Sequence, residues 1–191
     1  MPVETERKYR LNQTEAARIA AKLFEVNADF VGETEEENII FAGRPLSGKR
    51  AVVRIRRMPN VAILTYKRAI DGDQDFKQHI EIETGIEDAD ATEQILKELG
   101  LKRALVYEKR RKCWRLKDVE VVIDRLPFGE FLEIEGAVAG IIEAEKILGA
   151  ENLEYVRATY PRLTAAFGIE KDGVIEARFT DNYGGSSKRS S

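Results

Sequence analysis

The chain has 191 residues, 43% of them hydrophobic, and its 31 lysine and arginine residues nearly balance its 34 aspartate and glutamate residues. This length predicts one domain, and a net charge of -3 favours neither a nucleic-acid polymer nor a membrane surface as partner. The single cysteine, Cys113, excludes an internal disulfide. No apolar run is typical of a signal peptide or a membrane span, so we expect a cytoplasmic protein.

Two periodicities alternate along the chain, one typical of strands and one of amphipathic helices. They predict a strand over 3–10, a helix over 14–26, strands over 38–41, 50–57, 61–68 and 76–84, a helix over 91–99, strands over 105–116, 119–125 and 130–137, and helices over 141–148 and 155–167. Asn12 with Glu15, and Asp90 with Glu93, are typical of capping boxes, and Gly100 of a helix end. The tail over 182–191 is rich in glycine and serine, and we expect it to be mobile.

Turn signals lie between neighbouring strands at Pro59-Asn60, Asp71-Gly72-Asp73 and Lys117-Asp118. They favour antiparallel hairpins. Eight strands are enough to close a small barrel, and the four amphipathic helices need a surface on which to pack.

The strands carry charged side chains two residues apart, which places each pair on one face. The acidic positions are Glu4, Glu6, Glu81, Glu83, Asp124, Glu133 and Glu135, and the basic positions are Lys8, Arg54, Arg56, Lys67, Lys109 and Arg111. One interpretation is the solvated face of a one-sided sheet. The other is a barrel whose apolar face lies outward under the helices, so that the charges line its interior.

The like-charge pairs favour the second interpretation, because a solvated sheet gains from opposite charges across strands. Clustered carboxylates repel one another unless a cation lies between them. Carboxylate oxygens without cysteine or histidine indicate magnesium, manganese or calcium, and the lysine and arginine groups would match a polyanion.

The opening Glu4-Thr5-Glu6-Arg7-Lys8 resembles the ExExK signature of the CYTH superfamily, the triphosphate tunnel metalloenzymes. The resemblance continues through Arg54-Ile55-Arg56, Lys67, Glu81-Ile82-Glu83, Lys109-Arg110-Arg111, Ile123-Asp124, Phe131 to Gly136, and Thr159-Tyr160-Pro161-Arg162-Leu163. It implies an α+β fold, an eight-stranded closed antiparallel β-barrel or tunnel with helices outside. The domain would span residues 1–170, followed by a C-terminal extension over 171–191.

The resemblance also implies the roles of individual residues. Mg2+ or Mn2+ would be held by Glu4, Glu6, Glu133 and Glu135. The triphosphate would be held by Lys8, Arg54, Arg56, Lys67, Lys109 and Arg111. The catalytic set would be Lys8, Glu81, Glu83 and Asp124, the three acids acting through a second metal or the attacking water.

The chain departs from the family pattern at two places. Ala42 stands where members often carry an aspartate, and only Met1, Pro2 and Val3 precede Glu4, where cyclase-like members often have a His-Phe pair. Strand parity points Arg110 away from the site. His79 shares the parity of Glu81, and we expect a solvated histidine at a strand end rather than a proton shuttle.

Four functions follow from these patterns. The leading one is hydrolysis of inorganic triphosphate or of a small organic triphosphate, thiamine triphosphate or a nucleoside triphosphate. The alternative is a class IV-type adenylate cyclase that makes cyclic AMP and pyrophosphate from ATP. A non-catalytic polyphosphate or nucleotide sensor is the second alternative, and a lipocalin-like carrier would need an apolar interior. The oligomeric state, a homodimer included, stays open, and the helical charges such as Glu93 are expected on a solvated face.

Overall fold

The structure of the chain, a computed structural model, describes residues 3–70 and 76–180. Its strands are β1 (Val3–Leu11), β2 (Asp29–Gly43), β3 (Ala51–Met58), β4 (Val61–Ala69), β5 (Lys77–Ile86), β6 (Leu101–Leu116), β7 (Val119–Leu126), β8 (Gly129–Glu135), β9 (Ile169–Lys171) and β10 (Val174–Ala177). Its α-helices are α1 (Gln13–Glu25), α2 (Ala89–Glu98), α3 (Val138–Leu148) and α4 (Tyr160–Phe167), with a 3-10 turn at Arg44–Leu46.

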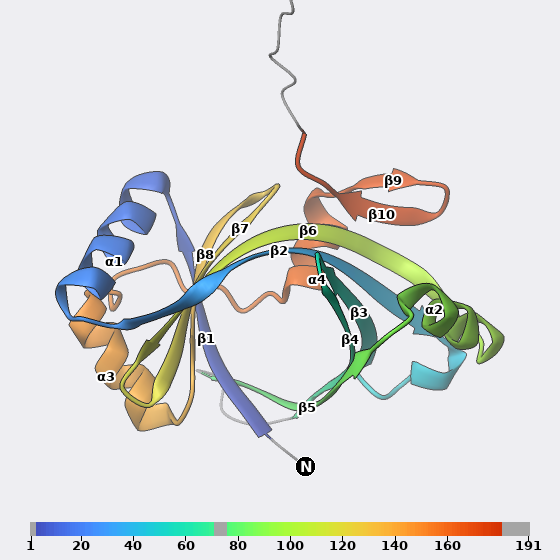
Figure 1. The fold of residues 1–191 in the computed structure, drawn as a ribbon, viewed down its shortest axis with the longest axis horizontal. Coiled ribbons are helices and arrows are strands. Elements are labelled where there is room, and N and C mark those ends of the chain that lie inside the picture. Colours follow the sequence, from blue (N-terminus) through green and yellow to red (C-terminus); the bar gives the residue numbers. More distant parts are fainter. Residues whose placement is uncertain (1–2, 71–75, 181–191) are drawn as a thin grey trace, which may run out of the picture.

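Eight of the strands form a closed barrel. Their order is β2-β3-β4-β5-β1-β8-β7-β6, and β6 pairs back with β2. Every neighbouring pair is antiparallel. In Figure 1 the long β2 and β6 arch over the top of the barrel and β5 lies at the bottom. The predicted closed antiparallel barrel is confirmed.

Helices cover two sides of the barrel from outside. Helices α1 and α3 lie together on one side and α2 on the other (Figure 1). Leu132 and Ile134 of β8 are fully buried against Ile19 and Leu23 of α1 and Ile141 of α3. Each such side chain contributes about 1.5 to 3 kcal/mol of transfer free energy when buried. Since strand side chains alternate, the charged positions of the same strands must face the interior.

The helix N-termini show one predicted cap and one correction. The backbone N–H of Glu15 donates to Asn12 Oδ1 at 2.9 Å, and that of Asn12 donates to Glu15 Oε2 at 2.7 Å, so the first capping box is confirmed. The cap of α2 is Asp88, which accepts from the backbone N–H of Ala91 at 2.8 Å, so the predicted Asp90 cap is wrong. Helix α2 starts at Ala89, before the predicted residue, and an acid stands at both 88 and 90.

Glu93 of α2 is buried in an ion pair with β6. Its side chain is 3% exposed and accepts from Arg103 at 2.6 and 2.5 Å. The expected solvated position is therefore wrong for this residue. The ion pair fastens α2 to β6.

Strand β2 is much longer than the predicted segment 38–41 and begins at Asp29. Its first half is acidic on both faces, so it lacks the apolar alternation of a strand. It is held by the basic half of β6, where Glu35 pairs with Arg110 at 2.9 Å and Glu36 with Lys109 at 3.2 Å. Opposite charges directly across two strands stabilise the pairing.

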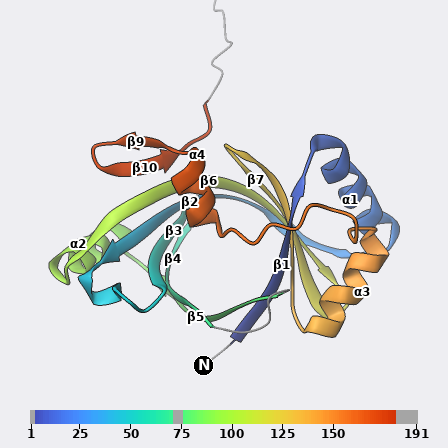
Figure 2. The same ribbon diagram turned by 180° about the vertical axis from the view of Figure 1, so that it is seen from behind.

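The segment before α4 is extended rather than helical. The backbone N–H of Val156 donates to the Lys8 carbonyl at 2.8 Å, and that of Arg10 donates to the Glu154 carbonyl at 2.9 Å. The segment thus occupies the edge of β1 beyond its pairing with β5. Helix α4 starts at Tyr160, with Thr159 as N-cap and a proline in its first turn, and the linker and α4 are seen from behind in Figure 2.

The C-terminal part of the described chain adds a hairpin, β9 and β10. Strand β10 pairs in parallel with β6, so part of the predicted extension over 171–191 is attached to the barrel sheet. The expected mobile tail over 182–191 and the predicted turn Asp71-Gly72-Asp73 lie outside the described residues. Over residues 3–70 and 76–180, no helix has the length and apolar character needed to cross a membrane.

Candidate active site

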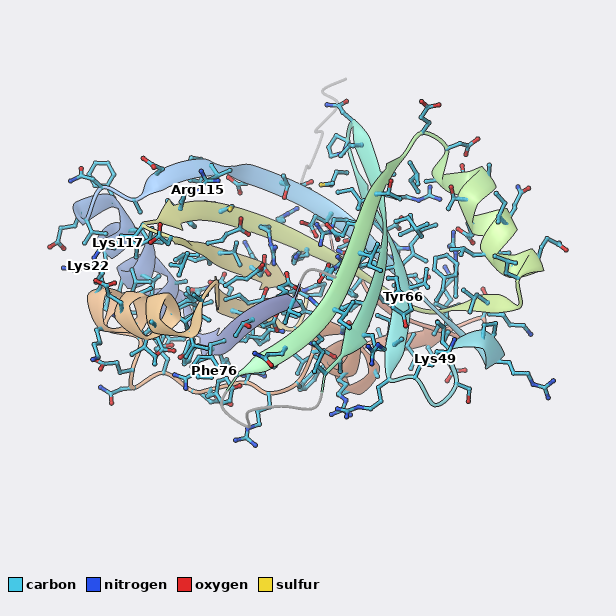
Figure 3. All side chains as sticks on the ribbon, turned by 90° about the horizontal axis from the view of Figure 1, so that it is seen from below. Lys22, Lys49, Tyr66, Phe76, Arg115 and Lys117 are labelled. Atoms are coloured by element: carbon cyan, nitrogen blue, oxygen red, sulfur yellow. The ribbon has the colours of Figure 1, made fainter. Side chains whose placement is uncertain are left out.

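A cavity of about 830 Å³ lies inside the barrel. Eleven of the thirteen predicted site residues line it: Glu4, Glu6, Lys8, Arg54, Arg56, Lys67, Glu81, Lys109, Arg111, Glu133 and Glu135. Many side chains that fill the space between the strands end in nitrogen or oxygen (Figure 3). The charged strand faces therefore point inward, as the second interpretation of the sequence predicts.

The acidic side of the cavity is formed by β1 and β8. Their antiparallel register places Glu6 opposite Glu135 and Lys8 opposite Glu133. Burial raises the pKa of Glu135 above its ordinary value, and a hydrogen bond with Glu4 only partly offsets that effect. Two acids placed face to face in this way favour a proton or a cation between them.

Glu133 has a different environment from its neighbour. Its Oε1 lies 3.0 Å from Lys8 Nζ, and its Oε2 accepts from Arg111 at 2.9 Å. Burial opposes ionisation, but Lys8, Arg111 and Lys109 together hold the pKa of Glu133 well below its ordinary value. Both oxygens are thus occupied by cations in this structure.

The basic side comes from β3, β4 and β6. Arg54 donates to Glu81 at 3.2 Å and to Glu83 at 3.0 Å, and Lys67 contacts Glu4 and lies 2.5 Å from Glu81. Each of these two cations therefore bridges two acids. A phosphate that entered the cavity would compete with carboxylates already in place.

Within residues 3–70 and 76–180, Asp124 and Glu83 are not among the residues that line the cavity. Asp124 is fully buried and accepts two hydrogen bonds from Arg111, at 2.8 and 2.7 Å, and one from the Tyr160 hydroxyl at 2.9 Å. Glu83 accepts from Arg54 and from the Thr65 hydroxyl at 2.6 Å. In this structure both acids contact groups that reach the cavity, rather than the cavity itself.

Sequence reasoning missed Glu36, which is 4% exposed and lies 3.2 Å from Lys109 and 3.4 Å from Arg56. Burial raises the pKa of Glu36, but Lys109 and Arg56 outweigh it and bring the pKa to about 2. Glu36 lies two residues before Asn38 and therefore on the same face of β2. The predicted strand began at residue 38, so this relation could be used only once β2 was known to begin at Asp29.

Tyr160 and Lys77 were also missed. Tyr160 lines the cavity, and Lys8 Nζ lies 3.6 Å from the centre of its ring. Lys77 shares the strand parity of Glu81 and pairs with Glu6 at 3.2 Å. Burial, and then Lys8, lower the pKa of Lys77.

Two aromatic residues of β6, Tyr107 and Trp114, lie in different environments. Tyr107 is 2% exposed and lines the cavity, with its ring centre 6.2 Å from that of Tyr160. Trp114 packs in the outer core against Phe30 at 5.3 Å between ring centres. Arg110 points away from the cavity and pairs with Glu35, as strand parity predicts.

His79 is 7% exposed, so the expected solvated histidine is wrong. It lies on the cavity wall opposite Glu4 in the pairing of β1 with β5. Burial, and then the charge of Lys67, lower the pKa of His79 to about 4.

The donor chemistry of the acidic side fits a divalent cation. Ligand atoms of Glu4, Glu6 and His79 all lie within 4.8 Å of one another. The four predicted metal ligands are thus divided, since Glu4 and Glu6 lie with His79, whereas Glu133 binds Lys8 and Arg111. Carboxylate oxygens are suited to magnesium and manganese, and an imidazole nitrogen adds affinity for first-row transition ions.

Comparison with known proteins identifies relatives of this chain in sequence and in fold. The CYTH domain family matches residues 2–160. A protein of Methanocaldococcus jannaschii, provisionally named an adenylate cyclase, is 29% identical over 185 residues, which cover 95% of this chain and 99% of the relative. A Pyrococcus horikoshii structure has a TM-score of 0.72 and 26% identity, covering 82% of this chain and 96% of its own.

A Hippeastrum protein, described as an adenylyl cyclase candidate that reveals a dominant triphosphatase activity, has the same fold. Its TM-score is 0.65 and its identity 15%, covering 87% of this chain and 96% of its own. The family match runs from the start of β1 to the first residue of α4 and includes every strand of the barrel. The chain therefore belongs to the CYTH domain family.

Proposed function

We propose that this chain is a divalent-metal-dependent phosphohydrolase that acts on inorganic triphosphate or on a small organic triphosphate, thiamine triphosphate or a nucleoside triphosphate. The observation that carries the proposal is the composition of the cavity. The carboxylates of β1 and β8 line the same cavity as ammonium and guanidinium groups from β3, β4 and β6. A polyanion with a bound cation matches both halves of such a wall.

The basic residues would hold the phosphates. Arg54, Arg56 and Arg111 offer planar guanidinium groups that match phosphate oxygens, and Lys8, Lys67 and Lys109 offer point charges. The cavity volume of about 830 Å³ lies within the range for sites that enclose small ligands.

The acidic residues would hold Mg2+ or Mn2+ through Glu4 and Glu6, with Glu133 and Glu135 beside them. When bound, the ion would supply Lewis-acid polarisation of the phosphoryl oxygens and would offset negative charge. Glu81 lines the cavity beside Lys67 and would orient the attacking water, while Asp124 would fix the guanidinium of Arg111. Lys8 would stabilise charge on the transferred phosphoryl group.

A cyclase is the second candidate, and the 29% identical relative with an adenylate cyclase name favours it. In that reaction the ribose 3′ hydroxyl of ATP attacks the α-phosphorus and pyrophosphate leaves. The hydrolase and the cyclase would use the same cations and the same metal. They differ in which phosphorus lies beside the nucleophile, so the products decide between them.

The experiment measures phosphate, pyrophosphate and cyclic AMP after incubation with inorganic triphosphate, thiamine triphosphate or ATP, with Mg2+ or Mn2+. We expect metal-dependent phosphate release that falls at least a hundredfold in the double variant Glu4→Gln, Glu6→Gln. Glu35→Gln is the matched control, because its side chain lies on the outer surface of β2. Cyclic AMP with pyrophosphate would replace the hydrolase by the cyclase, and binding without turnover would indicate a sensor.

A further inference from the structure

The acidic pair of β1 has a nitrogen donor beside it. Glu4 and His79 are directly opposite each other in the β1–β5 pairing, and Glu6 is opposite Lys77, the residue two positions before His79. Side chains directly opposite in an antiparallel pair have Cβ atoms about 5 Å apart on the same face. The barrel register itself therefore brings the imidazole next to both carboxylates.

The distances between the donor atoms are close to the distances between ligand atoms that bind one ion. The chosen ligand atoms of Glu4, Glu6 and His79 all lie within 4.8 Å of one another. Two ligands that bind one ion at about 2.1 Å are at most about 4.2 Å apart. Small rotations about the side-chain bonds would close this difference.

The imidazole is also incompletely satisfied. His79 is 7% exposed, and across residues 3–70 and 76–180 its Nδ1 has no hydrogen-bond partner. A buried polar atom without a partner costs about 1 to 3 kcal/mol. Because Nδ1 lies at the wall of a ligand cavity, a bond from this atom to a ligand would offset that free-energy cost.

We infer that His79 is a third protein ligand, from β5, to the divalent ion held by Glu4 and Glu6, and that it gives this site a preference for Mn2+ or another first-row transition ion over Mg2+. The inference rests on the proposed metal dependence, and it specifies which class of ion the enzyme prefers. Imidazole nitrogen is a good ligand for first-row transition ions, whereas magnesium is bound through oxygen.

Two ammonium groups lie against the acidic pair. Lys67 contacts Glu4, and Lys77 lies 3.2 Å from Glu6. A bound ion would compete with both lysines for the carboxylates, and an ammonium group released in this way would be available to a phosphate. His79 cannot form an ion pair of this kind with either lysine, so it favours the metal-bound arrangement.

The chain has a single histidine, which gives an unambiguous spectroscopic test. Untagged full-length protein is loaded with Mn2+ alone, and pulsed electron paramagnetic resonance is used to detect nitrogen coupling from a directly bound imidazole. We expect this coupling in the unaltered chain, and its loss in His79→Gln. Its absence from Mn2+-loaded protein would overturn the inference without any variant having to fold.

Binding titrations with Mn2+ and Mg2+ supply the second measurement. We expect His79→Gln to weaken Mn2+ binding at least tenfold, a loss comparable to that of disrupted metal sites, and Mg2+ binding less than threefold. Thr84→Ala is the control, because Thr84 is exposed on the same strand. Equal Mn2+ affinity in His79→Gln and the unaltered chain would contradict the inference.

The Glu4→Gln, Glu6→Gln variant separates the two proposals. Metal binding lost in this variant and retained in His79→Gln would refute the ligand role of His79 and leave the metal-dependent hydrolase in place. Failure of the unaltered protein to bind either ion, alone or with inorganic triphosphate, would refute both.

Discussion

Glu36 gives a quantitative prediction about stability in acid. Its folded-state pKa of about 2 lies below the ordinary value of 4.5 because Lys109 and Arg56 outweigh the opposing effect of burial. A depressed folded-state pKa adds stability that is present above pH 4.5 and is lost as the pH falls toward 2. Since a tenfold change in a protonation constant is worth about 1.4 kcal/mol, the full contribution is about 3 kcal/mol.

The assay is urea unfolding at pH 6, 5, 4 and 3. Linkage predicts that the unaltered chain loses about 2 kcal/mol of the Glu36 contribution by pH 3, in addition to what the other carboxylates lose. Glu36→Gln lacks this component, so its unfolding free energy should fall less steeply. It should also be lower at pH 6, by about 3 kcal/mol, because buried Lys109 and half-buried Arg56 lose a partner.

The matched control is Glu35→Gln, on the same strand, where the side chain is 70% exposed and pairs with Arg110. Its stability should follow that of the unaltered chain with pH. Parallel curves for the unaltered chain and Glu36→Gln down to pH 3 would refute the assignment of a depressed pKa to Glu36.

Two further substitutions probe contacts that join separate parts of the fold. Tyr160→Phe removes the buried hydroxyl that donates to Asp124 at 2.9 Å, and urea unfolding should show a loss of about 2 kcal/mol; an unchanged unfolding free energy would contradict this. Arg178→Ala removes the cation that lies 2.8 Å from Glu37 and 3.1 Å from Glu108, two acids directly opposite in the β2–β6 pairing. Because Arg178 is 39% exposed, the loss should be under about 1 kcal/mol and should vanish in 1 M salt, which melting at low and high salt would test.

The predictable part of the fold is the part whose strands alternate apolar and charged residues. In β3 Val53 and Ile55 alternate with charged residues and pack outward, as do Leu132 and Ile134 in β8. The strand period and the face of each side chain could therefore both be inferred from the sequence there. The same reasoning placed Arg54, Arg56, Glu133 and Glu135 toward the interior, where they lie on the cavity wall. A period of two gives the relative orientation of neighbours without knowledge of the partner strand.

The first half of β2 could not be found in that way. Residues 29–37 lack apolar alternation, and their extended conformation depends on pairing with the basic half of β6, about 75 residues later. Glu36 was missed for the same reason. The face to which its side chain points can be inferred only if residues 29–37 are known to form a strand. The burial of His79 is a similar case, since it depends on Glu4 of β1 and Ala69 of β4 on its two sides.

The ion pairs inside the barrel depend on the three-dimensional register of the strands. The sequence could therefore indicate which charged residues belong to the site, but not which of them pair with one another. Lys67 is held by Glu4 and Glu81, and Lys8 by Glu133, so the two signs neutralise each other without ligand. A buried charge needs such a partner, because an unpaired one costs several kcal/mol. A cation alone would take Glu4 and leave Lys67 less well paired, and a triphosphate alone would take Lys67 and leave Glu4 unpaired. Arrival of both exchanges one complete set of pairs for another, so this wall should bind the metal and the triphosphate with positive coupling, each raising the affinity for the other.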